Sequence, residues 1–208
     1  MLSNLLTLKR HLLPESWESE TNLDAVLTQL GHGVLGAFES YCARKFARVA
    51  DATFETPADA WFVALDRYPV ETVSALALQS AVTGEWEPLT VADVLTRLDK
   101  AAGTLRFVAE PGIYTDTLRV TFTGGYWFDT SEDEGEPDTM PAGANAVPPA
   151  LQYAWLAQCK HAFAESRLAG ARAIAIGEDA AKLARTGSGL ELLPMVQATL
   201  QPYRRLVG

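Results

Sequence analysis

Residues 117–126 read Thr-Leu-Arg-Val-Thr-Phe-Thr-Gly-Gly-Tyr, so apolar side chains alternate with polar ones as far as the two glycines. Successive side chains of a β-strand point to opposite faces of its sheet, and this alternation therefore predicts a strand with one buried face. Gly124 and Gly125 predict a turn directly after it. The stretch indicates an antiparallel sheet, because such a sheet packs one face on a core and leaves the other in water.

Segments on the N-terminal side of this strand have a similar character. Residues 70–78 and 104–109 are rich in strand-forming residues, and residues 61–65 are a short apolar run. Residues 91–101 differ, because their apolar side chains recur at three- and four-residue spacing and predict a short helix. Together these segments predict a β-rich insertion over about residues 54–128.

Apolar residues recur at helical spacing on both sides of this insertion. They predict helices over residues 4–13, 22–46 and 149–169. Each of the two long helices carries one apolar stripe, and we expect the stripes to pack against each other. Their members are Leu23, Leu27, Leu30, Val34 and Phe38 on the first helix, and Leu151, Trp155, Cys159 and Phe163 on the second.

The expected fold class is α+β: a mainly α-helical domain with a small antiparallel β-sheet inserted between the long helices. One domain would cover residues 1–170, and residues 171–208 would be a C-terminal extension. We expect a mobile acidic loop over residues 129–146, because few bulky apolar groups there can offset the entropy cost of ordering it. Its carboxylates include Glu132, Asp133, Glu134, Glu136 and Asp138.

The net charge of −9 argues against a broad grip on nucleic-acid phosphates, which requires clustered lysines and arginines. It permits a surface past which DNA slides without binding. No apolar run approaches the roughly 20 residues that cross a bilayer. Lys9 and Arg10 lie inside the apolar N-terminal stretch, whereas a signal peptide carries its charges before that stretch. We therefore expect a protein that is made in the cytoplasm and has no membrane partner.

The sequence shows no motif for catalysis or metal binding. None of the three histidines has a second ligand at a characteristic metal-binding spacing. Residues 186–189 place a serine between glycines but lack the strand and helix of a nucleophile elbow, and they indicate a hinge. Cys42 and Cys159 lie among helical apolar residues and are expected to be buried thiols. We predict that the protein is not an enzyme and has no catalytic, metal-binding or cofactor-binding residue.

The order of several stretches resembles the head–tail connector family of long-tailed bacteriophages, also called adaptor or head-completion proteins. The stretches are residues 6–12, the helix end at 41–46, the strand at 68–73, the strand end Val-Thr-Phe-Thr-Gly-Gly-Tyr at 120–126, and a proline before the last long helix. The resemblance covers about residues 5–170, which would be the connector domain. The loop at 129–146 and the segment 171–208 depart from the shorter family members.

The resemblance implies a structural virion protein and not an enzyme. Its subunits would form a homo-oligomeric ring, a dodecamer, between the portal protein and a tail-side stopper or tail-completion protein. DNA would pass through the ring during packaging and ejection without specific binding. The protein would be made in the host cytoplasm and reside at the head–tail interface of the virion, and the family implies no cofactor.

The C-terminal extension is the candidate portal-docking tail, and residues 186–189 would be its hinge. It contains apolar anchors, a tyrosine and two arginines, and tyrosine and arginine are enriched at interface hot spots. The candidate docking residues are Leu190, Leu192, Leu193, Met195, Val196, Leu200, Tyr203, Arg204 and Arg205. An alternative stays open, in which the last helix folds back on the core of its own subunit.

Three other functions stay open from the sequence alone. A stopper or tail-terminator virion protein would be dominated by β-structure. An enzyme such as a small hydrolase would hold a nucleophile and a base within hydrogen-bond reach. An acidic regulatory module would bind host proteins as a monomer or dimer and would not join a portal.

Overall fold

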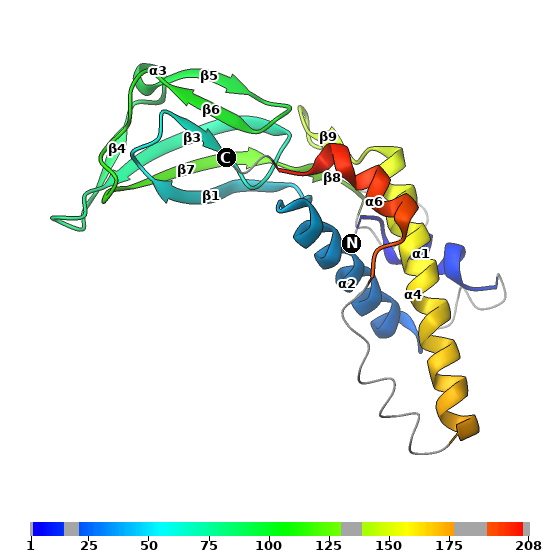
Figure 1. Ribbon diagram of the computed structural model, residues 1–208. Coiled ribbons are helices and arrows are strands. Elements are labelled where there is room, and N and C mark those ends of the chain that lie inside the picture. The colour runs from blue at the N-terminus through cyan, green and yellow to red at the C-terminus, as the bar shows by residue number, and fades with distance from the viewer. Residues whose placement is uncertain (1, 15–20, 130–138, 177–190, 206–208) are drawn as a thin grey trace. The chain divides into compact units, whose positions relative to one another are not determined.

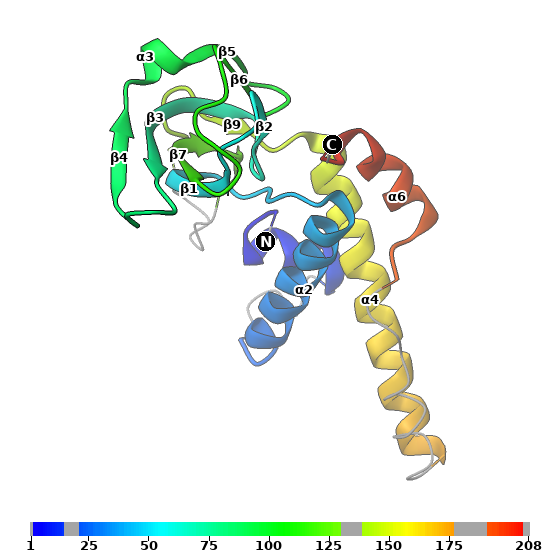
Figure 2. The same cartoon turned by 60° about the vertical axis from the view of Figure 1, so that its left-hand side comes forward.

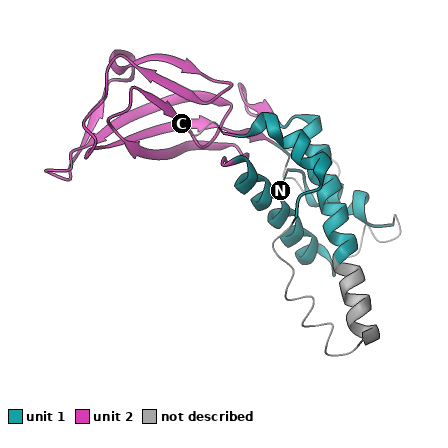
Figure 3. Cartoon of the chain, in the orientation of Figure 1, with its two compact units in different colours: residues 1–42, 128–139, 147–204 teal, residues 43–127, 140–146, 205–208 magenta. Residues whose placement is uncertain are grey.

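The computed structural model of this protein describes residues 2–14, 21–129, 139–176 and 191–205, and for residues 166–176 it describes the backbone only. The chain divides into two compact units, which Figure 3 shows in different colours. The helical unit comprises residues 1–42, 128–139 and 147–204, and the β unit comprises residues 43–127, 140–146 and 205–208.

The helical unit is built around one long helix. Its described elements are α1 (Leu5–Leu12), α2 (Asp24–Cys42), α4 (Pro149–Ile176), α6 (Pro194–Leu200) and the 3-10 turn η2 (Gln201–Tyr203). Helix α4 contacts α1, α2 and α6, and Figure 1 shows α6 lying alongside it. Three helices thus bury their apolar sides against a common partner.

Local interactions define where the first two helices begin. The Asn4 side-chain oxygen accepts a hydrogen bond from the Thr7 N–H at 2.8 Å, which satisfies one of the free donors at the start of α1. Lys9, nearly buried on α1, pairs with Asp24 in the first turn of α2 at 2.8 Å. An acidic residue at that position is favourable because the N-terminal end of a helix carries partial positive charge.

The predicted pairing of the two long helices is confirmed. Helices α2 and α4 are in contact, and the buried Trp155 donates a hydrogen bond from its indole Nε1 to the Gly31 carbonyl at 3.1 Å. The other stripe residues that are buried are Leu27, Val34, Phe38, Leu151 and Cys159. Leu23, Leu30 and Phe163 are half-buried and lie at the margin of this core.

The β unit contains two antiparallel sheets and one short parallel pair. Its elements are β1 (Val49–Pro57), β2 (Phe62–Ala64), β3 (Val70–Gln79), β4 (Trp86–Leu89), α3 (Val91–Val94), β5 (Leu95–Asp99), β6 (Thr104–Phe107), β7 (Thr117–Gly124), β8 (Tyr126–Trp127) and β9 (Asn145–Ala146). The strand orders are β1-β7-β3-β4, β2-β6-β5 and β8-β9. Figure 2 shows the two larger sheets of this unit.

The strand predicted from residues 117–126 lies inside the larger sheet. Strand β7 pairs with both β1 and β3, and its side chains alternate between buried and half-buried positions as predicted. Leu118, Val120 and Phe122 form one core with Leu105 and Phe107 of the smaller sheet. The two sheets therefore pack on each other, and the exposed faces point away from this core.

The turn after β7 requires glycine. Gly125 has a φ of +100°, and a Cβ atom at this position would lie 2.5 Å from the Ala47 carbonyl oxygen. A side chain would therefore be excluded both by backbone conformation and by space.

The expected fold class is wrong in its proportions. The described part of the chain contains nine β-strands beside its helices, so the structure is not mainly helical. The β region is also not a small insertion, because its two larger sheets enclose a core of their own. The β region is long enough to bury a core of its own, and the chain therefore divides into two compact units.

Two expected helices are shorter than predicted. The helix expected over residues 22–46 ends at Cys42, and Ala43 takes a positive φ of 51°. The helix expected over residues 91–101 continues only to Val94 and is followed by strand β5. The strand register shifts between Leu95 and Arg97, so Leu95 and Leu98 both pack on the core although they are three residues apart.

Several expectations lie outside the described residues. They concern most of the acidic loop (130–138), the hinge at 186–189 and Leu190. The domain boundary at residue 170 also stays a prediction, because the side chains of 166–176 are not described. Within the expected loop, residues 145–146 form the short strand β9.

Candidate interaction surfaces

The C-terminal segment is fastened to α4 by a buried amide. Gln158 is fully buried, its Nε2 donates to the Glu191 carbonyl at 2.9 Å, and its Oε1 accepts from the Leu193 N–H at 2.9 Å. The same side chain thus binds the main chain on both sides of Leu192. A buried amide is stable only when its donor and acceptor are both satisfied, and this geometry satisfies both.

Helix α6 buries one face against its own unit. Leu192, Val196 and Leu200 are buried, and α6 contacts both α4 and α2. Beyond it, the Tyr41 hydroxyl donates to Gln201 Oε1 at 3.3 Å, and the Arg204 guanidinium lies 5.5 Å from the centroid of the Tyr41 ring. The segment therefore begins on α4 and ends at the last turn of α2.

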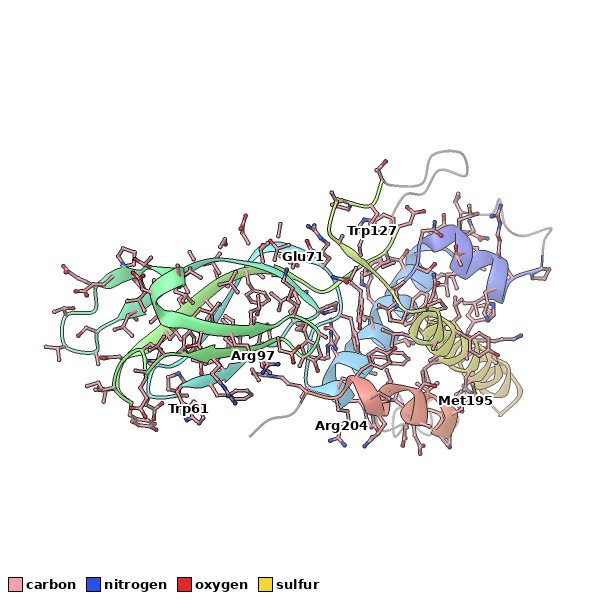
Figure 4. The ribbon with its side chains drawn as sticks, turned by 90° about the horizontal axis from the view of Figure 1, so that it is seen from above. Trp61, Glu71, Arg97, Trp127, Met195 and Arg204 are labelled. Carbon is pink, nitrogen blue, oxygen red and sulfur yellow. The ribbon has the colours of Figure 1, made fainter. Side chains whose placement is uncertain are left out.

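The structure does not gather the predicted docking residues into one exposed surface. Leu192, Val196 and Leu200 pack on their own subunit, as the alternative left open by the sequence requires, and Leu193 and Tyr203 are half-buried. Met195 is 50% exposed and Arg204 is exposed, and Figure 4 labels them at opposite ends of the segment. Arg205 belongs to the β unit, where it stacks on Phe54 and donates to the Ala64 carbonyl. Portal docking stays a prediction, and in this conformation the buried Leu192, Val196 and Leu200 are not available for it.

A second surface lies on the outer face of the smaller sheet. The strand register places Phe62 of β2 opposite Arg106 of β6, and Arg106 opposite Arg97 of β5. These three side chains form a row across all three strands, and they line an open hollow of about 180 Å³ together with Asp99 and Thr104. We call this row and the neighbouring Trp61 the arginine–aromatic face.

Both aromatic side chains of the arginine–aromatic face are accessible. Trp61 is 55% exposed and Phe62 is 47% exposed. The Arg106 guanidinium lies 5.2 Å from the centroid of the Trp61 ring, and Figure 4 shows Trp61 and Arg97 on the same side of the β unit. The face therefore combines two guanidinium groups with apolar ring surface, a combination that is frequent at protein interfaces.

The arginine–aromatic face is not among the sites predicted from the sequence. The alternation of Leu105 and Phe107 does place Arg106 outside the core, and this signal was available. Arg97, however, lies in a segment that was expected to be helical, so its position opposite Arg106 required the observed register of β5.

The cysteines and histidines do not form a reactive cluster in the described part of the chain. Burial raises the pKa of the Cys159 thiol to about 12, so the thiol stays protonated near neutral pH. Cys42 is also buried, and its Sγ contacts the Leu200 carbonyl at 3.8 Å. His161 faces Glu165 at 3.5 Å on the surface of α4. Within the described residues, no three His, Cys, Asp or Glu side chains are grouped to hold a metal ion.

None of the helices described is both long and apolar enough to cross a membrane. No model of a known protein family matches the sequence, and no curated protein matches it.

Solved structures do share the fold. One is a chain in the neck of an empty gene transfer agent (GTA) particle, computed with C6 symmetry; it is 19% identical, with a TM-score of 0.59, and the match covers 98% of this chain and 90% of that chain. A chain in the neck of the native particle, computed with C12 symmetry, is 21% identical with a TM-score of 0.51, over 89% of this chain and 85% of that chain. A chain in the virion of the native particle is 19% identical with a TM-score of 0.57, over 98% and 90%.

At these identities the likeness establishes a shared fold. It extends over both units of the chain, because the matches with the empty neck and with the virion cover nearly all of it.

Proposed function

We propose that this protein is a structural subunit of the neck of a phage-like particle, where it acts as the head–tail connector. The observation that carries the proposal is the fold shared, over 98% of the chain, with a chain in the neck of a gene transfer agent particle. The sequence resemblance to connectors supports it independently, because it rests on the order of motifs and not on the fold.

We propose further that the functional form is a homo-oligomeric ring. The neck structures that contain similar chains were computed with C6 and C12 symmetry. A ring closes when each subunit offers two different complementary surfaces to its neighbours. This chain has large apolar side chains exposed in both of its units, among them Tyr153 in the helical unit and Trp61 in the β unit, as such surfaces require.

In this role the ring lies between the portal protein and a tail-side stopper, and DNA passes through its channel. The charge of −9 per subunit supports a channel that does not retain DNA, because like charges repel the phosphate backbone. No enzymatic step is part of the proposal. The virion is then the place where the protein resides after its synthesis in the host cytoplasm.

The decisive experiment is to co-express the chain with the portal protein of the same particle and to examine the purified complex by electron microscopy. We expect a second ring, co-axial with the portal ring. A chain that stays monomeric beside assembled portal would contradict the proposal. A chain that leaves the portal bare but joins a preformed connector–portal complex would instead be a stopper or tail-terminator.

A further inference from the structure

The arginine–aromatic face contains an unbalanced pair of charges. Arg97 and Arg106 lie directly opposite each other on neighbouring strands, and like charges in this arrangement destabilise a sheet. Neither guanidinium forms an ion pair with any residue in the described part of the chain. Both arginines are exposed, so water screens part of the repulsion, and an added anion would remove the rest.

Asp99 offsets this pair only in part, because one carboxylate faces two guanidinium groups in the hollow and forms an ion pair with neither of them. It is the acidic residue that lines the same hollow, but its Oδ1 accepts hydrogen bonds from the Ala101 and Ala102 N–H groups, each at 3.1 Å. Asp99 thus serves the turn between β5 and β6. The face therefore offers donors for carboxylates that must come from elsewhere.

The aromatic residues indicate what kind of molecule supplies those carboxylates. Trp61 and Phe62 expose ring surface next to the guanidinium groups, and Trp, Phe and Arg are enriched in protein–protein interfaces. A small anion would use the arginines and leave the rings in water. A peptide segment with carboxylates and intervening backbone would cover both.

The chain itself contains a segment of this chemistry. Residues 132–138 read Glu-Asp-Glu-Gly-Glu-Pro-Asp and carry five carboxylates, a dense concentration of negative charge in a chain with 26 acidic residues in total. In a ring, each copy presents one surface to one neighbour and a different surface to the other. A basic face and an acidic segment are such a pair of surfaces.

We propose that the arginine–aromatic face binds the acidic segment 132–138 of a neighbouring copy of this chain. The carboxylates accept hydrogen bonds from Arg97 and Arg106, and the segment covers Trp61 and Phe62. The inference rests on the proposed ring, because it names a contact between adjacent subunits of that ring. The contact aligns neighbours electrostatically and weakens as salt rises.

A peptide experiment tests the contact without requiring a ring. A labelled peptide spanning residues 129–140 is titrated with the full-length protein, and binding is followed by fluorescence anisotropy. We expect binding that weakens at least about tenfold when the protein carries Arg97→Glu and Arg106→Glu. The control peptide carries Glu132→Gln, Asp133→Asn, Glu134→Gln, Glu136→Gln and Asp138→Asn and should not bind.

A matched control protein separates this effect from net charge. The variant with Lys100→Glu and Lys160→Glu makes the same change in charge at two exposed lysines outside the face, and it should bind the peptide like the wild type. Circular dichroism melting shows whether the arginine variant folds; if it does not, Arg97→Gln with Arg106→Gln takes its place. Absence of peptide binding to wild-type protein, or equal loss in the lysine control, overturns the proposal.

A complementation experiment tests the contact between whole subunits. One variant carries Arg97→Glu and Arg106→Glu, and a second carries Glu132→Lys, Glu134→Lys and Glu136→Lys. Each alone should assemble poorly, because its face and segment carry the same charge. Mixed together they should assemble in alternation, as measured by sedimentation velocity. Loss of assembly without rescue in the mixture contradicts the acidic segment as the occupant.

Two outcomes distinguish this inference from the proposed function. Peptide binding without any association with portal would count against the connector role and leave the contact intact. Normal rings on the portal without peptide binding would count against the contact alone. Binding of a single-stranded oligonucleotide in place of the peptide, abolished by the arginine variant, would show that the face serves nucleic acid and would overturn the inference.

Discussion

At the scale of single residues, Arg44 shows why a charged side chain is retained inside the β unit. It is only 3% exposed, and its guanidinium lies 3.3 Å from the centroid of the Tyr68 ring, 4.9 Å from that of Phe46 and 5.6 Å from that of Tyr126. These rings come from segments far apart in the chain. A planar cation that stacks on several rings thus joins the start of the β unit to the strand that follows β7.

Arg44→Lys should therefore destabilise the β unit. Lysine keeps the charge but loses the planar stacking, so we expect the free energy of unfolding to fall by about 1–2 kcal/mol. Urea denaturation followed by tryptophan fluorescence measures this change. Arg97→Lys is the control, since Arg97 is exposed and its replacement should change stability by less than about 0.5 kcal/mol. Equal effects of the two substitutions would contradict the stacking role.

Both cysteine thiols are protected by burial in the helical unit. Burial raises the pKa of Cys159 from 9.0 to about 12 in the folded chain, and Cys42 is also buried. As pH rises, the Cys159 thiol therefore ionises at a lower pH in the unfolded chain than in the folded chain. The contribution of this burial to the free energy of unfolding should be fully present below about pH 8 and should be lost as the pH rises from 9 toward 12. At pH 8 a thiol reagent should modify neither cysteine in the native protein and both in denaturant. Rapid modification of the native protein would show that the helical core is open.

Among the helices and strands, the sequence predicted those whose spacing of apolar residues follows one regular period along the whole element. The alternation of residues 117–123 was enough to predict β7, and helical spacing was enough to predict α1, α2 and α4. Strand β5 lies in a segment predicted to be helical, because a register shift gives its apolar side chains a three-residue spacing. The order β2-β6-β5 depends on pairing between distant segments, which no local pattern encodes.

The packing of α6 also depends on contacts with residues that are distant in sequence. The segment is amphipathic, and its sequence fits both a docking tail and a last helix on the core of its own subunit. In this conformation Gln158, a residue on α4 that is distant in sequence, binds the main chain of the segment at Glu191 and Leu193. A buried glutamine does not stand out in a sequence, because its role exists only once its partners are in place.

Gln158→Leu should release the C-terminal segment. The substitution leaves the Glu191 carbonyl and the Leu193 N–H without their partner, and such buried groups cost about 1–3 kcal/mol. Hydrogen exchange of residues 191–203 should therefore accelerate while exchange in β7 stays unchanged. Gln152→Leu, at a half-buried position of the same helix, is the matched control and should leave exchange unaltered. Unchanged protection in the Gln158 variant would mean that apolar packing alone holds α6.

At the scale of the whole molecule, the two compact units present different chemistry for assembly. The β unit offers the arginine–aromatic face, and the helical unit offers the exposed side of its C-terminal segment. A connector needs contacts with its neighbours in the ring and contacts with the portal, and separate surfaces allow both at once. Truncation is a poor test of portal docking by the C-terminal segment. Removing the residues after 190 would also remove the buried Leu192, Val196 and Leu200 from the core of the helical unit.

Point substitutions on the exposed side of the segment test portal docking without that damage. Met195 is half-exposed and Arg204 is exposed, so Met195→Asp with Arg204→Glu should leave the melting temperature nearly unchanged. If this side contacts the portal, an unpaired charge placed in the interface should weaken binding at least about tenfold, measured by pull-down with assembled portal rings. The control, Val26→Asp, changes a 56% exposed residue of α2 that lies outside this segment. Portal binding that survives the first pair, or that is lost equally with the control, would remove the C-terminal segment from the portal contact and leave its role as a strap on α4.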